Sequence, residues 1–118
     1  MQNYKIVLPE HLNSHGSLFG GYMLMWVDEV AWIAARLDYP ECKFVTIGLD
    51  NVEFRRSIHE GAIIRFQVDR VRTGTTSVAY RVEAHHRAAG TSEEAVAFGT
   101  EITLVRVDDQ GQKLALDA

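Results

Sequence analysis

The spacing of hydrophobic residues changes near residue 42, from a nearly continuous apolar run to an alternation of apolar and polar positions. Between about Gly20 and Leu37 almost no polar stripe interrupts the apolar side chains. A helix that is apolar on most sides is buried on most sides, so we expect one long buried helix here. It should end before Pro40, because the residue preceding a proline avoids helical geometry. Four large side chains of this helix are expected in the core or in a subunit contact: Met23, Met25, Trp26 and Trp32.

The chain after Cys42 is typical of β-strands, because apolar and polar side chains alternate with a period of two. A first short strand is expected around residues 4–8. The run from Phe44 to Phe54 changes its apolar phase near Asp50-Asn51, which predicts a β-bulge. The links at residues 57–61, 73–76 and 87–92 are short, so the strands that they join are expected to be antiparallel neighbours.

These patterns predict an α+β fold in which a curved antiparallel sheet of about five or six strands wraps around one long central helix. Only a sheet that curls around the helix would bury it on several sides. The length of 118 residues, with 47% hydrophobic and 24% charged residues, suits a single domain over residues 1–118. Such a small chain has little volume for a deep pocket of its own, so a site shared between subunits must be considered.

Charge and cysteine content exclude several classes of protein. Twelve Lys and Arg against 16 Asp and Glu give a net charge of −4, which argues against a general nucleic-acid binder. One cysteine, Cys42, excludes an internal disulfide and a cysteine-rich zinc site. The adjacent His85 and His86 point to opposite faces of a strand and cannot readily chelate one metal. No signal peptide or membrane span is visible, so we expect a cytoplasmic protein that does not associate with a membrane. From the charge, cysteine and histidine content, we also expect that it binds neither nucleic acid nor a metal.

Two features could carry chemistry at the start of the predicted helix and within it. Gly20 and Gly21 would let a ligand approach the first-turn amides, which lack helical partners and can stabilise an oxyanion. Alternatively, the two glycines only allow tight packing of the helix. Asp28 is a carboxylate on a very apolar helix, so it needs partners or a cavity and is a functional candidate. The alternative is that Asp28 faces solvent at an exposed rim, where Glu29 is also expected.

The chain resembles the acyl-CoA hydrolase branch of the hotdog-fold thioesterases over nearly its whole length. The motif that carries the resemblance is Asn13-x-x-Gly16-x-x-Phe19-Gly20-Gly21, followed by Trp26-Val27-Asp28-Glu29. Further matches are Phe54-Arg55-Arg56, Gly74-Thr75-Thr76-Ser77 and Asp109-Gln110-Gly111. The resemblance implies a hotdog fold and the hydrolysis of acyl-CoA to free CoA and a carboxylic acid. It implies no cofactor, since CoA is part of the substrate.

The resemblance also implies residue roles. Asp28 would be the catalytic carboxylate, either as a general base on water or as a nucleophile. Asn13 would orient water or substrate, and the amides of Gly20 and Gly21 would polarise the thioester carbonyl. The implied substrate-binding residues are His15, Gly16, Phe19, Arg56, Gly74, Thr75, Thr76 and Ser77. Some relatives have a basic residue immediately before Gly74, where this chain has Thr73.

Helix geometry favours a site shared by two subunits. Gly21 and Asp28 are seven residues apart, which is about 10 Å along a helix at ~1.5 Å per residue. One carbonyl needs its hydrogen-bond donor and its attacking group within about 3 Å. We therefore expect Asp28 to work with Asn13, Gly20 and Gly21 of the partner subunit in a homodimer. A tetramer and a hexamer are equally compatible with the sequence.

Two other functions remain open on the same fold. A non-catalytic acyl-CoA sensor would bind CoA esters without turnover, although Asn13, Gly20, Gly21 and Asp28 are all present. A hotdog dehydratase or hydratase normally needs a carboxylate paired with a histidine, and no histidine is placed convincingly beside Asp28. The acyl chain preference is not readable from the sequence.

Overall fold

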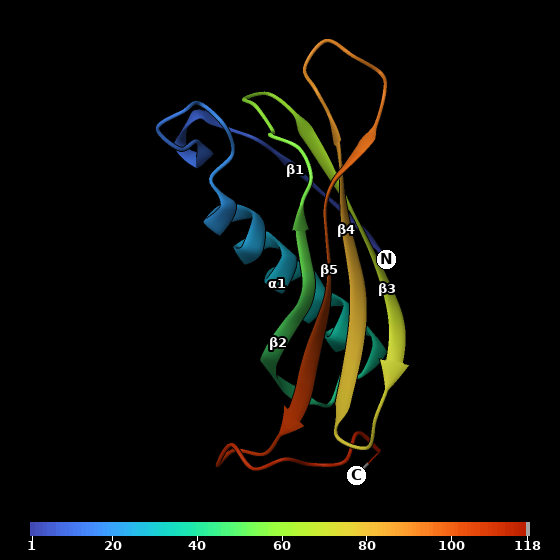
Figure 1. The fold of residues 1–118 in the computed structure, drawn as a ribbon. Coiled ribbons are helices and arrows are strands. Elements are labelled where there is room, and N and C mark those ends of the chain that lie inside the picture. The colour runs from blue at the N-terminus through green and yellow to red at the C-terminus, as the bar shows by residue number, and fades with distance from the viewer. Residues whose placement is uncertain (118) are drawn as a thin grey trace.

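The computed structural model describes residues 1–117, which form one antiparallel sheet with a long helix lying against it (Figure 1). The elements in chain order are β1 (Gln2–Ile6), a 3₁₀ turn (Pro9–His11), α1 (Gly20–Asp38), β2 (Lys43–Phe54), β3 (Ile63–Thr73), β4 (Ser77–Arg87) and β5 (Ala95–Val107). The predicted α+β class, the antiparallel strands and the long helix are confirmed. The first strand lies two residues earlier than expected, because Pro9 already belongs to the 3₁₀ turn.

The strand order is β1-β3-β4-β5-β2. It contradicts the expectation that the link at residues 57–61 joins two neighbouring strands. The short link after β2 does not join neighbouring strands, because β2 pairs with β5 while β3 pairs with β1 and β4. Residues 55–62 can span roughly 26 Å when extended at ~3.3 Å per residue, whereas three strand spacings need only about 14 Å. The link therefore crosses the end of the sheet, where Arg55 N donates to Ala97 O and Leu18 N to Ile58 O.

The core lies between α1 and the facing side of the sheet. Alternate residues of the central strands are fully buried, among them Phe66, Tyr80, Val82, Phe98 and Ile102. The helix contributes its own buried stripe, which comprises Met23, Trp26, Val27, Val30, Ala31, Ala34 and Ala35. Burying these side chains is the main favourable contribution to folding.

The expectation that α1 is buried on most sides is wrong for the single chain. Its second apolar face is exposed, with Met25 at 53%, Trp32 at 36% and Leu37 at 67% of their full exposure. One sheet layer covers only one side of a helix, so the other side is left open. Contiguous exposed apolar surface of this kind is typical of an interaction or ligand-binding site.

The predicted bulge in β2 is confirmed. Pairing of β2 with β5 shifts between Asp50 and Glu53, and Asn51 has a φ of 54°. The buried Thr100 hydroxyl donates to the Asp50 carbonyl at 2.9 Å, which holds the bulge against β5. Beyond it, the phase of β2 changes, and Phe54 reaches the start of α1, where its ring lies 3.4 Å from the position of a Cβ on Gly20.

Candidate active site

Asp28 lies half-buried on the open side of α1, and its carboxylate is held from the neighbouring strand. The Thr46 hydroxyl on β2 donates to Asp28 Oδ1 at 2.6 Å, and the Trp32 indole Nε1 donates to Thr46 Oγ1 at 3.0 Å. No residue within 1–117 donates to Asp28 Oδ2. The arrangement therefore presents one fixed carboxylate with one oxygen bonded and the other open.

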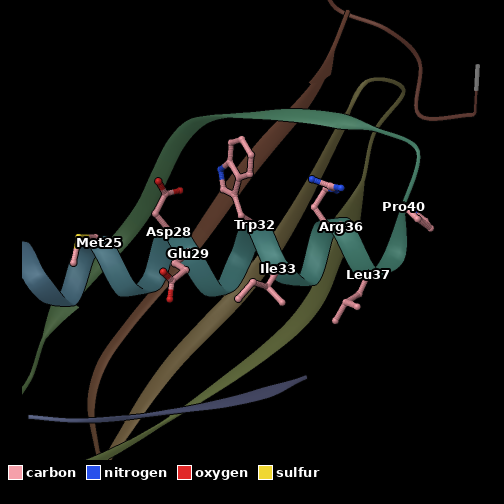
Figure 2. A pocket seen from close by; sticks show the side chains of 8 residues that line it. All are labelled: Met25, Asp28, Glu29, Trp32, Ile33, Arg36, Leu37 and Pro40. Atoms are coloured by element: carbon pink, nitrogen blue, oxygen red, sulfur yellow. The ribbon is translucent and has the colours of Figure 1, made fainter.

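Asp28 lines an open, mostly apolar pocket of about 620 Å³ on the exposed face of α1. Figure 2 shows Asp28, Trp32 and Arg36 pointing toward one side of the helix and Glu29, Ile33 and Leu37 toward the other. The pocket is completed by Met25 and Pro40. Glu29 is exposed and ion-paired with Lys5 at 3.2 Å, as expected for a residue on the rim. Asp28 differs from Glu29 because its carboxylate has a hydrogen-bond partner on β2, although both residues line the same open pocket.

Thr46 is the partner of Asp28 that the sequence did not predict. The signal that could have found it is its position in the alternation of β2, where Phe44 is buried and Val45 and Ile47 are exposed. Thr46 thus shares the inward phase with Phe44, at a place where an apolar residue is expected. A hydroxyl there needs a hydrogen-bond partner, and Asp28 is that partner.

Asn13 holds the loop that precedes α1. Its side-chain Oδ1 accepts from the backbone N–H groups of His15 at 2.9 Å and Ser17 at 3.1 Å. A second backbone bond runs from Asn13 N to Ser17 O at 2.7 Å. The side-chain amide hydrogens of Asn13 have no acceptor within residues 1–117. The loop therefore fixes the Asn13 side chain and leaves its two donors available.

The first two amides of α1 are also available as donors. Tyr22 N and Met23 N donate to Phe19 O, whereas the N–H groups of Gly20 and Gly21 have no acceptor within residues 1–117. Partial positive charge gathers at such a helix start. A Cβ on Gly21 would lie 2.6 Å from the Phe19 ring. The two amides therefore remain open donors, while Gly20 lies against Phe54 of the sheet and Gly21 against the Phe19 ring.

A second pocket, of about 500 Å³, gathers part of the predicted site. Asn13, His15, Gly20 and Arg56 line it, whereas Asp28 does not. Arg55 pairs with Glu53 at 3.4 Å, and Arg56 forms no ion pair within residues 1–117. The pockets that contain Asp28 and Asn13 share no lining residue. One chain therefore presents the two halves of the predicted site in separate places.

The remaining predicted substrate-binding residues are not brought to either pocket. Gly16 is exposed in the loop with a φ of +81°, and Phe19 is 53% exposed at the N-cap of α1. Residues 74–77 form the β3–β4 turn, which lies at the end of the sheet opposite the loop before α1 (Figure 1). The C-terminal segment contacts this turn, since Leu116 N donates to Thr75 O, and Arg106 N at the end of β5 donates to Thr76 O.

Two ionisable pairs lie away from both pockets. Burial, and then donation to Asp38, raise the pKa of the Tyr80 phenol well above its ordinary value. Two hydrogen bonds from Arg65 lower the pKa of Glu94 and hold this carboxylate on the outer side of the sheet. Within residues 1–117, no group of three or more His, Cys, Asp or Glu side chains could hold a metal ion, and no helix is long and apolar enough to cross a membrane.

Comparison with known proteins decides the family. The model described as the thioesterase superfamily matches residues 15–92, a segment that contains Asp28, Thr46 and Arg56. The chain belongs to the thioesterase superfamily. Acyl-coenzyme A thioesterase 11 of Mus musculus is 30% identical to this superfamily member over 117 residues, which are 97% of the chain and 20% of the mouse protein. The chain thus spans about a fifth of the length of that relative.

Solved structures of thioesterases have the same fold. A hexameric hotdog-fold thioesterase of Campylobacter jejuni is 30% identical, with a TM-score of 0.85 over 96% of this chain and 86% of the other. The acyl-CoA hydrolase of Staphylococcus aureus, in complex with butyryl-CoA, CoA and CoA disulfide, is 26% identical. Its TM-score is 0.87, over 98% of this chain and 70% of the hydrolase chain. The predicted hotdog fold and the predicted resemblance to acyl-CoA thioester hydrolases are confirmed.

Proposed function

We propose that this chain hydrolyses the thioester of acyl-CoA to free CoA and a carboxylic acid. The observation that carries the proposal is Asp28, a carboxylate that lines an apolar pocket, with one oxygen held by Thr46 and the other without a donor within residues 1–117. In the reaction, water adds across the C–S bond: its oxygen goes to the acyl carbon and a proton to the CoA sulfur. The open oxygen of Asp28 either takes the proton from water or attacks the acyl carbon itself, and water then releases the acid.

The residue types around Asp28 support this role. Crystal structures of the S. aureus acyl-CoA hydrolase include alanine variants of an asparagine, an aspartate and a threonine. That asparagine precedes the aspartate by fifteen positions, the separation of Asn13 and Asp28 here. The threonine follows the aspartate by seventeen positions, and Thr46 follows Asp28 by eighteen. We therefore assign Asn13, Asp28 and Thr46 to one catalytic group.

This group is complete only when two copies of the chain combine. Asn13 and Gly20 line one pocket and Asp28 another, so in the proposed homodimer Asp28 meets Asn13 and Gly20 of the partner subunit. The apolar face of α1 that includes Met25 and Trp32 is open to a second copy, and so is the unpaired edge of β2. The C. jejuni relative is hexameric, and a hexamer can be built from such dimers.

The free donors at the start of α1 and in the second pocket supply the rest of the proposed site. The Gly20 and Gly21 amides polarise the thioester carbonyl and stabilise the negative charge on its oxygen. Arg56, which has no carboxylate partner within residues 1–117, binds a CoA phosphate. Residues 74–77 contact the CoA moiety from another subunit, since they line neither pocket of their own chain. Acyl-CoA and the single Cys42 both suit a cytoplasmic enzyme.

The test measures CoA release with a thiol reagent, using acyl-CoAs of several chain lengths. We expect turnover by the unaltered chain and a loss of about 10²- to 10⁴-fold in Asp28→Asn. Glu29→Gln is the matched control, because Glu29 is the adjacent carboxylate and lines the same pocket but is paired with Lys5, so its turnover should fall far less than that of Asp28→Asn. Circular dichroism checks that both variants keep the fold. Saturable binding of CoA esters without any CoA release would overturn the proposal in favour of a sensor.

A further inference from the structure

Trp32 occupies a position from which it can act on Asp28 without touching it. The two residues lie one turn apart on α1, and Figure 2 shows both pointing toward the same side of the helix. The link between them is Thr46 of β2, which accepts from Trp32 Nε1 at 3.0 Å and donates to Asp28 Oδ1 at 2.6 Å. The indole is 36% exposed, so its place in the fold is not explained by core packing alone.

The numbers of available protons fix the direction of this chain of hydrogen bonds. An indole N–H can only donate, a carboxylate can only accept, and a hydroxyl has one proton and two acceptor lone pairs. Because Trp32 occupies an acceptor site of the Thr46 oxygen, the single proton of Thr46 is directed to Asp28 Oδ1. The β-branched side chain of Thr46 has few rotamers, which helps to keep this geometry.

We propose that Trp32 is a positioning residue for Asp28, which acts through Thr46 to keep Oδ1 occupied and Oδ2 aimed at the substrate. Without the indole donor, the Thr46 hydroxyl could rotate and offer its proton to water. Asp28 would then sample other side-chain angles, and fewer molecules would hold the reactive geometry. This inference rests on the proposed thioesterase function for its kinetic consequences, whereas the hydrogen-bond chain itself can be measured without turnover.

The kinetic test is a double-mutant cycle with Trp32→Phe, which keeps an aromatic ring but removes the donor, and Thr46→Val. We expect Trp32→Phe to lower kcat by about three- to tenfold, the range of one neutral hydrogen bond, with KM changed less than twofold. In the Thr46→Val background the same substitution should have no further effect on kcat. If Trp32→Phe lowers kcat equally in both backgrounds, Trp32 acts by another route and the proposal is wrong.

A second measurement separates this inference from the proposed function. The second measurement is NMR of the indole N–H groups. The protein contains two tryptophans, so two indole N–H resonances are expected, and the one that is lost in Trp32→Phe belongs to Trp32. We expect that resonance to shift in Thr46→Val and to stay in place in Glu29→Gln. If the Trp32 resonance does not shift in Thr46→Val, the hydrogen bond from Trp32 to Thr46 is absent and the inference is wrong, whatever the assay of CoA release shows. A shift without any hydrolysis would contradict the function and leave the chain of hydrogen bonds established.

Discussion

Removal of the Thr46 hydroxyl should impair turnover while leaving the fold intact. Thr46→Val keeps the shape of the side chain and deletes the donor that lies 2.6 Å from Asp28 Oδ1. A hydrogen bond to a charged group contributes about 1.5–3 kcal/mol, and about 1.4 kcal/mol corresponds to a tenfold change in rate. Thr46 is only half-buried, so water can partly replace the lost donor. We therefore expect the lower end of the range, a fall in kcat of about tenfold.

The assay is steady-state release of CoA, with kcat and KM measured separately. Thr46→Ser is the matched control, because it keeps the hydroxyl and loses only a methyl group, and it should retain kcat within about threefold of the unaltered chain. KM should change little in either variant, since Thr46 holds Asp28 and does not line the pockets. Equal losses in Thr46→Val and Thr46→Ser would refute the reasoning, because the hydroxyl would then not be the cause.

Three further predictions concern other parts of the fold. Gly21→Ala should reduce turnover, since its Cβ would lie 2.6 Å from the Phe19 ring, and adding Phe19→Ala should restore part of the rate if the clash is the cause. Arg56→Ala should raise KM for acyl-CoA several-fold in low salt and Arg55→Ala should raise it less, because only Arg55 is paired with a carboxylate. The free energy of unfolding should decrease above about pH 10. Burial raises the pKa of Tyr80 in the folded state, so only the unfolded chain releases that proton, and Tyr80→Phe should remove this part of the pH dependence in denaturant titrations.

The fold could be predicted because its periodicities are unambiguous. The helix was expected at residues 20–37 and lies at Gly20–Asp38, and the phase change in β2 correctly indicated a bulge. The strand order could not be predicted in the same way. Short links favour neighbouring strands, but the eight residues after β2 are long enough to cross the end of the sheet, and only tertiary packing decides between these outcomes.

The candidate site could be predicted only in part. Asp28 was found because a carboxylate is conspicuous on an apolar helix, whereas Thr46 was missed because threonine is common in strands. The spacing along the helix indicated that Asp28 lies too far from Gly21 for both to act on one carbonyl within a chain. The structure is compatible with that reasoning, since Gly20, the neighbour of Gly21, lines a different pocket from Asp28. The proposed contribution of a second copy would depend on contacts that no local pattern encodes.

The most direct test of the shared site combines two inactive variants in one dimer. A chain carrying Asp28→Ala and a chain carrying Asn13→Ala are given different affinity tags, mixed, and purified as the doubly tagged heterodimer. If Asp28 works with Asn13 of the partner subunit, one of the two sites is intact, so turnover per dimer should return to about half of the unaltered value. If both residues act within one chain, neither site is intact. A purified heterodimer as inactive as its parents would contradict the account.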